Sequence, residues 1–437
     1  MIMTFSVENW RSFREPATLN MTATSEKQHV DRLPAIAKYR LKLLPISAIY
    51  GANASGKTKF IEALAFLQNL VLQGTQNQSQ KIALERFKLE TEWLTKPSRF
   101  AIDVLIDGLI YTYEISLQPE KILEERLIIQ NSCTAYDVFT RIDGQVMSYD
   151  TDYFNQEEIE FLNFIAKATR SNQLFLTNAV QLNMGRLRPL YDWFASKLTV
   201  ISPNIQRLAD PGAVLSEHTT KLMRMLGTGI DHFETVKLAD IDASLPKKLL
   251  NEIQQQLSRP DDVFRSHDII VRMENDELVF EKLLAVHKNL RGENIRFQLN
   301  EESDGTKRLL DLIPAFAKLK EGQGTVFVID ALDRSLHTQL LEWLLKYFLD
   351  ACHADSRNQL IFTTHDVNIL TQDLFRRDEL WGIDKNPDGA SILYSFRDFK
   401  KNQKRQGHSQ SLFERPDGSC SDIFLNSGVQ AWPGRSR

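Results

Sequence analysis

The stretch Gly51 to Thr58, GANASGKT, has the residue types and spacing of a phosphate-binding loop, GxxxxGK[ST]. Its glycines allow successive backbone N–H groups to curl around phosphate oxygens, and a helix beginning behind the loop adds the positive end of its dipole. Lys57 can then reach the β- and γ-phosphates, and the Thr58 hydroxyl can bind magnesium. The residues predicted to contact a nucleotide are Gly51, Ala52, Asn53, Ala54, Ser55, Gly56, Lys57 and Thr58.

A carboxylate that helps to hold the magnesium is expected at the end of a neighbouring strand. In VFVIDALDRSLH, Val326 to His337, four apolar residues lead into Asp330, which has this setting. An apolar run that ends in aspartate is a weak signal by itself, but its pairing with the loop favours the metal role. His365 in LIFTTHD also follows an apolar strand, where it could contact a γ-phosphate or position water. A histidine in that setting is otherwise most often part of the core.

The elements around these residues follow an α/β pattern. The apolar run LLPISAIY, residues 43–50, predicts a strand that leads into the glycine loop. The segment KTKFIEALAFLQNLVLQ, residues 57–73, predicts a helix, with Phe60, Leu64, Leu67 and Val71 on one face. Two early strands and a β-hairpin turned at Asp107-Gly108 add antiparallel pairing. After residue 300 the pattern predicts a helix, a strand, a helix and a strand, in the segments 306–320, 325–330, 338–352 and 359–365.

These segments predict an α/β nucleotide-binding domain with a mixed sheet that is split by a helical insertion. The expected divisions are the N-terminal half over 1–150, a helical insertion or lid with a short arm over 151–299, and the C-terminal half over 300–400. The insertion includes the amphipathic piece SLPKKLLNEIQQQL and has no sustained heptads, so it does not predict a coiled coil. Residues 401–437 form an atypical tail.

Composition is that of an ordinary globular protein: 437 residues, 42% hydrophobic and 25% charged. No apolar run approaches the roughly 20 residues that cross a bilayer, and the N-terminus lacks the features of a signal peptide. The sequence therefore predicts a cytoplasmic protein without a membrane partner. The net charge of -4 neither requires nor excludes nucleic acid.

The segment NEESDGTKRLLDLIP, upstream of Asp330, resembles the signature motif of ABC-type ATPases in the SDGT form used by relatives of RecF and the SMC proteins. ENWRSF near the N-terminus and LDRSLH after Asp330 resemble the opening strand and the D-loop of the same group. Within this group the chain is similar to the AAA-family ATPases of bacterial anti-phage modules, of the RloA and AbiL type and the AriA type of PARIS. The motifs occur from Glu8 to His365, so the resemblance covers most of the chain.

The resemblance implies a homodimer, with scope for higher assembly, in which ATP and Mg²⁺ lie between the phosphate loop of one subunit and the signature of the other. Ser303 and Gly305, with Asp304 between them, would contact the γ-phosphate of the partner's nucleotide. Asp333 would lie in the D-loop and His365 would be the switch histidine. Such sites also contain a glutamine, for which Gln181 in FLTNAVQLN is the candidate.

Ala331 stands where the resembling ATPases carry a glutamate that acts on the attacking water. Without a carboxylate there, the site keeps its binding groups and loses the group that orients and deprotonates water. The sequence therefore predicts an ATPase with impaired hydrolysis. Two explanations remain open: the alanine was introduced to trap ATP, or the natural protein is a slow switch.

Two functional classes follow from the resemblance. In one, the chain is a sensor or scaffold of an anti-phage module that controls a separate effector, such as a nuclease; in the other, it is a RecF-like repair ATPase that binds DNA ends or gaps. The segment after His365 lacks the run of carboxylates expected of a metal-dependent nuclease, which favours a separate effector. Arg186, Arg188 and the basic stretch 397–405 are candidate DNA contacts, with an ordinary solvated surface as the alternative.

The tail from about residue 401 suggests a shifted reading frame. NQKRQGHSQSLFERPDGSCSDIF lacks periodicity and core pattern. Codons exist for it whose next frame encodes an ending of the YLxGRxGAxP type, which resembles the ending common in the anti-phage relatives. We expect no functional role for the residues of this tail.

Overall fold

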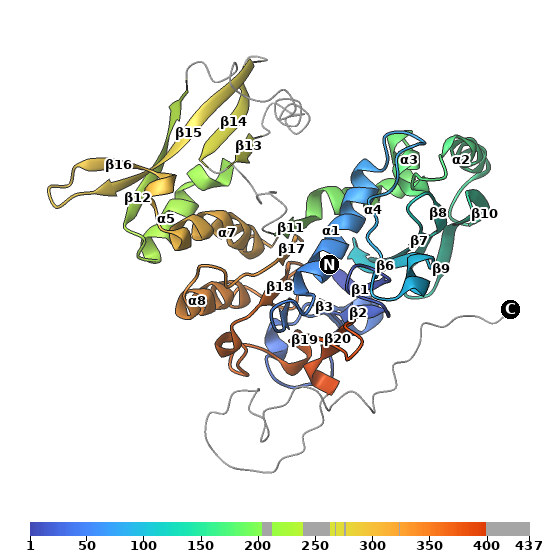
Figure 1. The fold of residues 1–437 in the computed structure, drawn as a ribbon, viewed down its shortest axis with the longest axis horizontal. Coiled ribbons are helices and arrows are strands. Elements are labelled where there is room, and N and C mark those ends of the chain that lie inside the picture. Colours follow the sequence, from blue (N-terminus) through green and yellow to red (C-terminus); the bar gives the residue numbers. More distant parts are fainter. Residues whose placement is uncertain (203–211, 239–262, 267, 275–276, 323, 399–437) are drawn as a thin grey trace, which may run out of the picture. The chain divides into compact units, whose positions relative to one another are not determined.

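The chain forms two compact units. The computed structural model describes residues 1–202, 212–238, 263–266, 268–274, 277–322 and 324–398 (Figure 1). Unit 1 comprises Met1–Val200, Gly324–Leu332 and Leu349–Arg437; unit 2 comprises Ile201–Gln323 and Asp333–Phe348. The amphipathic piece 244–257 and the atypical tail 401–437 lie outside the described residues.

A six-stranded sheet forms the centre of unit 1, in the order β11-β17-β18-β5-β19-β20. The strands β17, β18, β5 and β19 run parallel, and β20 is antiparallel to β19. Every residue of β17 and β18 is buried, as expected for the continuous apolar runs of parallel strands. The bounds are β5 (Ile46–Tyr50), β11 (Leu198–Ile201), β17 (Val326–Ile329), β18 (Gln359–Thr364), β19 (Leu380–Lys385) and β20 (Ser391–Ser395).

The second sheet of unit 1 has seven strands in the order β10-β9-β8-β7-β6-β1-β2, all antiparallel. The predicted hairpin is confirmed as β6 and β7, and its turn residues Asp107 and Gly108 both have positive φ, 46° and 77°, as a two-residue hairpin turn requires. The bounds are β1 (Ile2–Glu8), β2 (Ala17–Asn20), β6 (Ser98–Ile106), β7 (Leu109–Leu117), β8 (Ile122–Gln130), β9 (Ala135–Ile142) and β10 (Gln145–Tyr149). A two-stranded ribbon, β3 (Ala35–Ile36) and β4 (Leu41–Lys42), completes the strands described in this unit.

The helix α1 (Lys57–Gln73) follows the glycine loop directly. Phe60, Leu64, Leu67 and Val71 are all buried, which confirms the face predicted from their spacing. Three further helices of unit 1 follow the second sheet: α2 (Gln156–Ala168), α3 (Phe175–Gln181) and α4 (Arg188–Asp192), the last continued by a π-helical turn, Trp193–Lys197.

Unit 2 is an antiparallel sheet with helices. The strands are ordered β12-β15-β14-β13, and β16 pairs with the other end of β15. The helices α5 and α7 contact each other, and α5 packs on β12. The bounds are β12 (Ile230–Lys237), β13 (Val263–Ser266), β14 (Ile269–Glu274), β15 (Glu277–Lys288), β16 (Asn294–Gln298), α5 (Glu217–Met225), α7 (Asp304–Lys320) and α8 (Thr338–Leu349).

The predicted helical insertion over 151–299 is corrected by this sheet. Residues 156–197 are helical as expected, but they belong to unit 1, so the boundary predicted at residue 150 moves to Val200. Within the described residues, 230–298 are mainly strands rather than helices. These strands lack a clean period-two alternation: β12 buries Ile230 and Phe233, three residues apart, and β14 buries the adjacent Ile270 and Val271, so their sequence pattern does not mark them as strands. Among the helices of the described residues, none is long and apolar enough to cross a membrane.

Candidate nucleotide-binding site

Three neighbouring parallel strands of unit 1 bring the predicted residues to one edge of the sheet. The loop that starts at Gly51 follows β5, His365 follows β18, and Asp330 follows β17. The strand β18 pairs with both of the others, so the three carboxyl ends lie side by side. The carboxyl edge of a parallel sheet is the usual place for ligands in α/β folds.

The phosphate loop requires glycine at both glycine positions of its motif, Gly51 and Gly56. Gly56 has a φ of 120°, and a Cβ there would lie 2.4 Å from the Ser391 Oγ and 2.9 Å from the Ser12 Oγ. A Cβ on Gly51 would lie 2.3 Å from the carbonyl oxygen of Ile383. Any larger residue would force the backbone away from these neighbours, so the loop keeps its shape only with glycines.

Two serines and a tryptophan brace the loop from behind. The Ser391 Oγ donates to the carbonyl oxygen of Ser55 at 2.5 Å, and the Ser391 N–H donates to the carbonyl oxygen of Ser12 at 2.7 Å. The Trp10 indole N–H donates to the carbonyl oxygen of Lys59 in the first turn of α1, at 2.9 Å. No motif in the sequence points to Ser391, and Trp10 and Ser12 belong to the segment ENWRSF, whose only signal is its resemblance to an opening strand.

The side chain of Lys57 is buried within the loop. Its Nζ donates to the carbonyl oxygens of Gly51 and Ala52, at 2.6 and 2.8 Å, and lies 3.2 Å from the Nδ1 of His365. Because an ammonium group can only donate, Nδ1 must be the acceptor, so a neutral His365 carries its proton on Nε2. The structure therefore brings two of the predicted residues, Lys57 and His365, into contact.

Asp330 is 2% exposed and is held by a residue that the sequence analysis did not identify, Thr363 on β18. The Thr363 hydroxyl donates to the Asp330 Oδ1 at 2.6 Å and accepts the backbone N–H of Ala331 at 2.7 Å. Ala331 has a φ of 49°, in the left-handed region, and the next N–H, from Leu332, donates to the carbonyl oxygen of Thr363 at 3.0 Å. Thr363 thus fixes both the carboxylate and the turn that carries Ala331.

These residues fit a magnesium nucleotide. The close approach at Gly51 and Gly56 leaves a glycine cradle at the start of α1, where backbone N–H groups and the helix dipole favour phosphate. Magnesium is usually held by one or two protein oxygens together with phosphate oxygens, and Thr58 and Asp330 supply that chemistry. Within the described part of the chain there is no cluster of three or more His, Cys, Asp and Glu side chains suited to holding a metal on its own.

The predicted signature residues lie in unit 2, at the start of α7. Ser303 is the N-cap of this helix, and its Oγ accepts the backbone N–H of Thr306 at 3.1 Å. The side chain of Asp304 is 85% exposed. A Cβ on Gly305 would lie 3.0 Å from the carbonyl oxygen of Ser335, so Ser335 of the predicted D-loop, Leu332 to His337, lies against the signature turn.

Gln181 does not join the site, which corrects its assignment. It is exposed at the end of α3, and α3 is anchored elsewhere: the buried Glu125 accepts the backbone N–H groups of Phe175 and Leu176 at 2.6 and 2.9 Å. The Thr177 hydroxyl of the same helix donates to the carbonyl oxygen of Val71, near the end of α1. At a rise of about 1.5 Å per residue, that end of α1 lies about 20 Å from its start at the loop.

Comparison with known proteins identifies the family. The sequence model described as "AAA domain, putative AbiEii toxin, Type IV TA system" matches residues 46–371. A comparison with curated proteins finds no match.

Among solved structures, three SMC head domains are similar to this chain. An SMC head bound to the C-terminal winged-helix domain of ScpA is 11% identical with a TM-score of 0.41, covering 90% of this chain and 97% of that one. The SMC head domain from Thermotoga maritima is 13% identical with a TM-score of 0.35, covering 90% and 98%. The Smc head domain with an extended coiled coil, bound to the C-terminal domain of ScpA, from Pyrococcus furiosus is 11% identical with a TM-score of 0.39, covering 90% and 96%. With TM-scores below 0.5, these likenesses do not by themselves establish the fold.

The family match rests on firmer ground, because it includes the phosphate loop, Asp330 and His365 and extends over more than half of the chain. The mixed α/β fold and the glycine cradle at the start of α1 agree with it. The chain therefore belongs to the family of AAA domains described as "putative AbiEii toxin, Type IV TA system", and it is an ATPase of the AAA type.

Proposed function

We propose that this ATPase is the nucleotide-gated sensor or scaffold of an anti-phage defence module and controls a separate effector protein. The observation that carries the proposal is the division of its nucleotide-binding groups. The phosphate loop, Asp330 and His365 gather in unit 1, whereas Ser303 and Asp304 lie exposed at the start of α7 in unit 2. A second copy of the chain would supply the signature turn to the nucleotide held by the first.

ATP binding by this chain should be strong and its hydrolysis slow. Lys57 would contact the phosphates, while Thr58 and Asp330 would hold Mg²⁺, which when bound neutralises charge on the phosphate oxygens. The methyl group of Ala331 can neither orient water nor accept its proton. The ATP-bound state would therefore persist, which suits a switch that holds an effector until a trigger arrives.

The helix dipole of α7 supports the role proposed for the signature turn. Ser303, Asp304 and Gly305 lie at the N-terminal end of a 17-residue helix, where backbone N–H groups favour an anion. Because Ser303 and Asp304 are exposed, they are accessible to the nucleotide of a second subunit. Closure of two chains around two nucleotides would bury them.

A defence role is better supported than DNA repair. The family description names a putative toxin of a toxin–antitoxin system and does not name a repair protein. The candidate DNA contacts are engaged with carboxylates: Arg186 pairs with Glu158 at 2.8 Å, and Arg188 with Asp192 at 3.4 Å. Most of the basic stretch 397–405 lies outside the described residues.

The experiment that tests the proposal is ATP-dependent self-association, measured by sedimentation with and without Mg-ATP. We expect the chain to form a dimer in Mg-ATP and Ser303→Asp to remain a monomer that still binds ATP. Aspartate is a good N-cap, so this variant keeps the start of α7 while it sets a carboxylate against the phosphate. Ser303→Thr is the matched control, because threonine retains both the cap and the hydroxyl.

If the Ser303→Asp variant dimerises as readily as the chain with Ser303, the signature turn does not contact the nucleotide. The repair alternative has its own test, which is binding to duplex and gapped DNA across a series of salt concentrations. Tight binding that weakens steeply with salt would favour the RecF-like function.

A further inference from the structure

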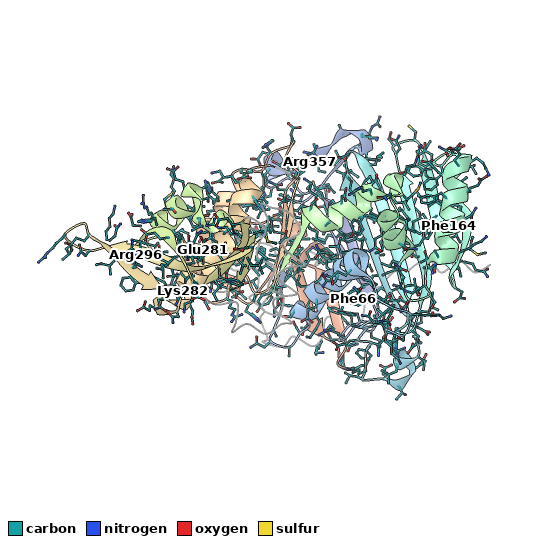
Figure 2. The ribbon with its side chains drawn as sticks, turned by 90° about the horizontal axis from the view of Figure 1, so that it is seen from above. Phe66, Phe164, Glu281, Lys282, Arg296 and Arg357 are labelled. Carbon is teal, nitrogen blue, oxygen red and sulfur yellow. The ribbon has the colours of Figure 1, made fainter. Side chains whose placement is uncertain are left out.

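The helix α2 carries two exposed phenylalanines, Phe161 and Phe164, which are 40% and 63% exposed. No other phenylalanine side chain that the structure describes is exposed. Figure 2 shows Phe164 on this helix, at the periphery of unit 1. Because the two residues lie three positions apart, they are neighbours on one face of the helix. Single exposed apolar residues are ordinary on protein surfaces, but two adjacent aromatic rings on one face indicate an interaction surface.

The opposite face of α2 fixes the helix to unit 1. Leu162 and Ile165 are completely buried, and α2 packs against α3 and β10. A capping box closes the start of the helix: the Asn155 side chain accepts the Glu158 N–H at 2.9 Å, and the Glu158 carboxylate accepts the Asn155 N–H at 3.0 Å. A capped and packed helix presents its exposed rings in a fixed position, which lowers the entropy lost when a partner covers them.

Charged residues are divided between the two ends of this exposed face. Glu157 and Glu160 lie in the first half of α2, Lys167 lies in its last turn, and all three are exposed. Their spacing of three, four and seven positions from one another and from the phenylalanines places them beside the rings. In the described part of the chain neither Glu157 nor Lys167 takes part in an ion pair, and the Glu160 carboxylate accepts a long bond, 3.5 Å, from the Gln156 amide.

The face is complementary to itself when two copies of α2 pack antiparallel. A two-fold axis between Phe161 and Phe164 sets Phe161 of one copy against Phe164 of the other. At a rise of about 1.5 Å per residue, Glu160 lies about 4 Å before this midpoint and Lys167 about 7 Å beyond it. Opposite copies therefore bring Glu160 and Lys167 to within about 3 Å of each other along the helix axis, which the long lysine side chain can span. A parallel arrangement would set acid against acid instead.

We propose that α2 is a self-association surface, through which two copies of this chain pair antiparallel without nucleotide and bury their Phe161 and Phe164 side chains. The inference goes beyond the proposed function, whose interface involves the phosphate loop and the signature turn. The helix α3, against which α2 packs, bonds α1 near the end that lies far from the loop, where the Thr177 hydroxyl donates to the Val71 carbonyl oxygen at 2.7 Å. Two different two-fold interfaces on one chain link copies into assemblies larger than a dimer.

The pairing through α2 is expected to be weak, because a single helix face is a small interface. The 13 residues of α2 span about 20 Å, whereas stable dimers bury about 800 Å² on each partner. We therefore expect a Kd in the micromolar range or above. At concentrations below this range only the nucleotide-dependent pairing persists, so the Ser303→Asp comparison is made there.

Sedimentation of the full chain without nucleotide, across a series of concentrations, tests the pairing. We expect a monomer–dimer equilibrium for the unmodified chain, weakened at least tenfold in Phe164→Asp and changed less than twofold in Asn163→Asp. Asn163 is the matched control, since it is exposed on the same helix but points about 100° away from its neighbour Phe164. Aspartate there adds the same charge away from the two rings.

Charge exchange tests the antiparallel arrangement. Lys167→Glu sets acids opposite acids and should weaken the pairing at least threefold. The double variant Glu160→Lys with Lys167→Glu restores opposite charges between the copies and should recover most of that loss. A double variant that pairs no better than Lys167→Glu alone would contradict the arrangement.

The proposal is overturned if the unmodified chain stays monomeric at every concentration without nucleotide, or if Phe164→Asp pairs as tightly as the unmodified chain. A monomer that binds vesicles of anionic phospholipid, and loses this binding in Phe164→Asp, would assign the face to a lipid surface and also overturn the proposal. Failure of ATP to promote further association, in a chain that pairs without nucleotide, would instead contradict the proposed function and leave this inference standing.

Discussion

In unit 1 the lysine and the aspartate expected to bind the magnesium nucleotide are buried, whereas in unit 2 the signature residues Ser303 and Asp304 are exposed to solvent. Lys57, Asp330 and Thr363 are each less than a tenth exposed, and hydrogen bonds fix all three. Ser303 and Asp304 are exposed, and the contacts that hold Ser303 are those of a helix cap. The phosphate loop is thus preorganised by its own unit, while the signature turn is presented outward.

The difference has a physical basis in the elements that carry each site. Parallel strands end together at one edge of a sheet, so they concentrate side chains from distant parts of the chain in one buried place. A helix N-terminus offers its N–H groups outward and needs only a cap to be complete. If the comparison is right, substitutions in unit 1 should change nucleotide chemistry and stability, and equivalent substitutions in unit 2 should change mainly association.

The largest effect should come from Ala331→Glu, which we expect to raise the rate of ATP hydrolysis by about 100- to 10,000-fold, the usual contribution of a general base. The left-handed backbone at residue 331 already carries an L side chain and residue 331 is only partly buried, so glutamate adds little strain. The measurement is steady-state phosphate release at saturating Mg-ATP. If both proteins release phosphate at equal and substantial rates, the general base is a residue other than residue 331. If both rates are negligible, the protein is a switch that hydrolyses ATP only when its partner or trigger is bound.

Lys57→Ala should weaken ATP binding by about 10- to 100-fold, since a charge-assisted hydrogen bond contributes about 1.5–3 kcal/mol. Calorimetry with the chain that carries Ala331 measures this directly. Lys59→Ala is the matched control: Lys59 lies two residues further along α1, and its Nζ pairs with Glu62 at 3.0 Å. Nucleotide affinity that is unchanged in Lys57→Ala would remove the assignment of an ATP site to this loop.

Gly56→Ala and Gly305→Ala compare the two units through the same substitution. At Gly56 the positive φ and the close Ser391 and Ser12 hydroxyls should lower the free energy of unfolding by about 1–3 kcal/mol. At Gly305 the backbone is helical, and the nearest atom to the added Cβ is the Ser335 carbonyl oxygen at 3.0 Å. The gain in helix propensity should therefore offset much of the crowding. Denaturant unfolding of both variants checks the difference, and an equal loss in the two would contradict it.

Thr363→Val should have an effect on stability of the same size as Gly56→Ala, because it removes the hydroxyl between Asp330 and the Ala331 N–H and leaves both groups with one partner fewer. We expect a loss of about 1–3 kcal/mol in the free energy of unfolding, together with weaker Mg-ATP binding. Ser47→Ala, on the adjacent strand β5, is the control, because the buried Ser47 hydroxyl has no hydrogen-bond partner among the described atoms. The two variants should differ by at least 1 kcal/mol in chemical denaturation, about the value of one hydrogen bond.

Much of unit 1 could be predicted from local pattern. The helix predicted over 57–73 has those bounds in the structure, and the strands at 46–50, 326–329 and 359–364 lie within their predicted segments. The site residues of the loop, Asp330 and His365 followed from the same pattern, because each directly follows an apolar strand. The role of the signature residues stays a prediction.

Other parts could not be predicted because long-range contacts define them. In the strands of unit 2 buried and exposed residues alternate only weakly, so the sequence pattern predicts a helical insertion there. Pairing with β15 is what gives β12 and β14 a stable face. Gln181 was placed by analogy, while Glu125 and Thr177 anchor its helix far from the loop. Neither Glu125 nor Thr177 lies in a motif that would mark it as an anchor of this helix.

The sequence by itself determined where the groups expected to bind the nucleotide lie along the chain, because the phosphate loop and the start of α1 depend on neighbours only a few residues apart. Only the tertiary structure decided how those groups are held. Ser391 bonds the loop at Ser55 across 336 positions, and Thr363 bonds Asp330 across 33. Such pairs form because the order β17-β18-β5-β19-β20 sets their strands side by side, and strand order is a property of the whole packed sheet rather than of any segment.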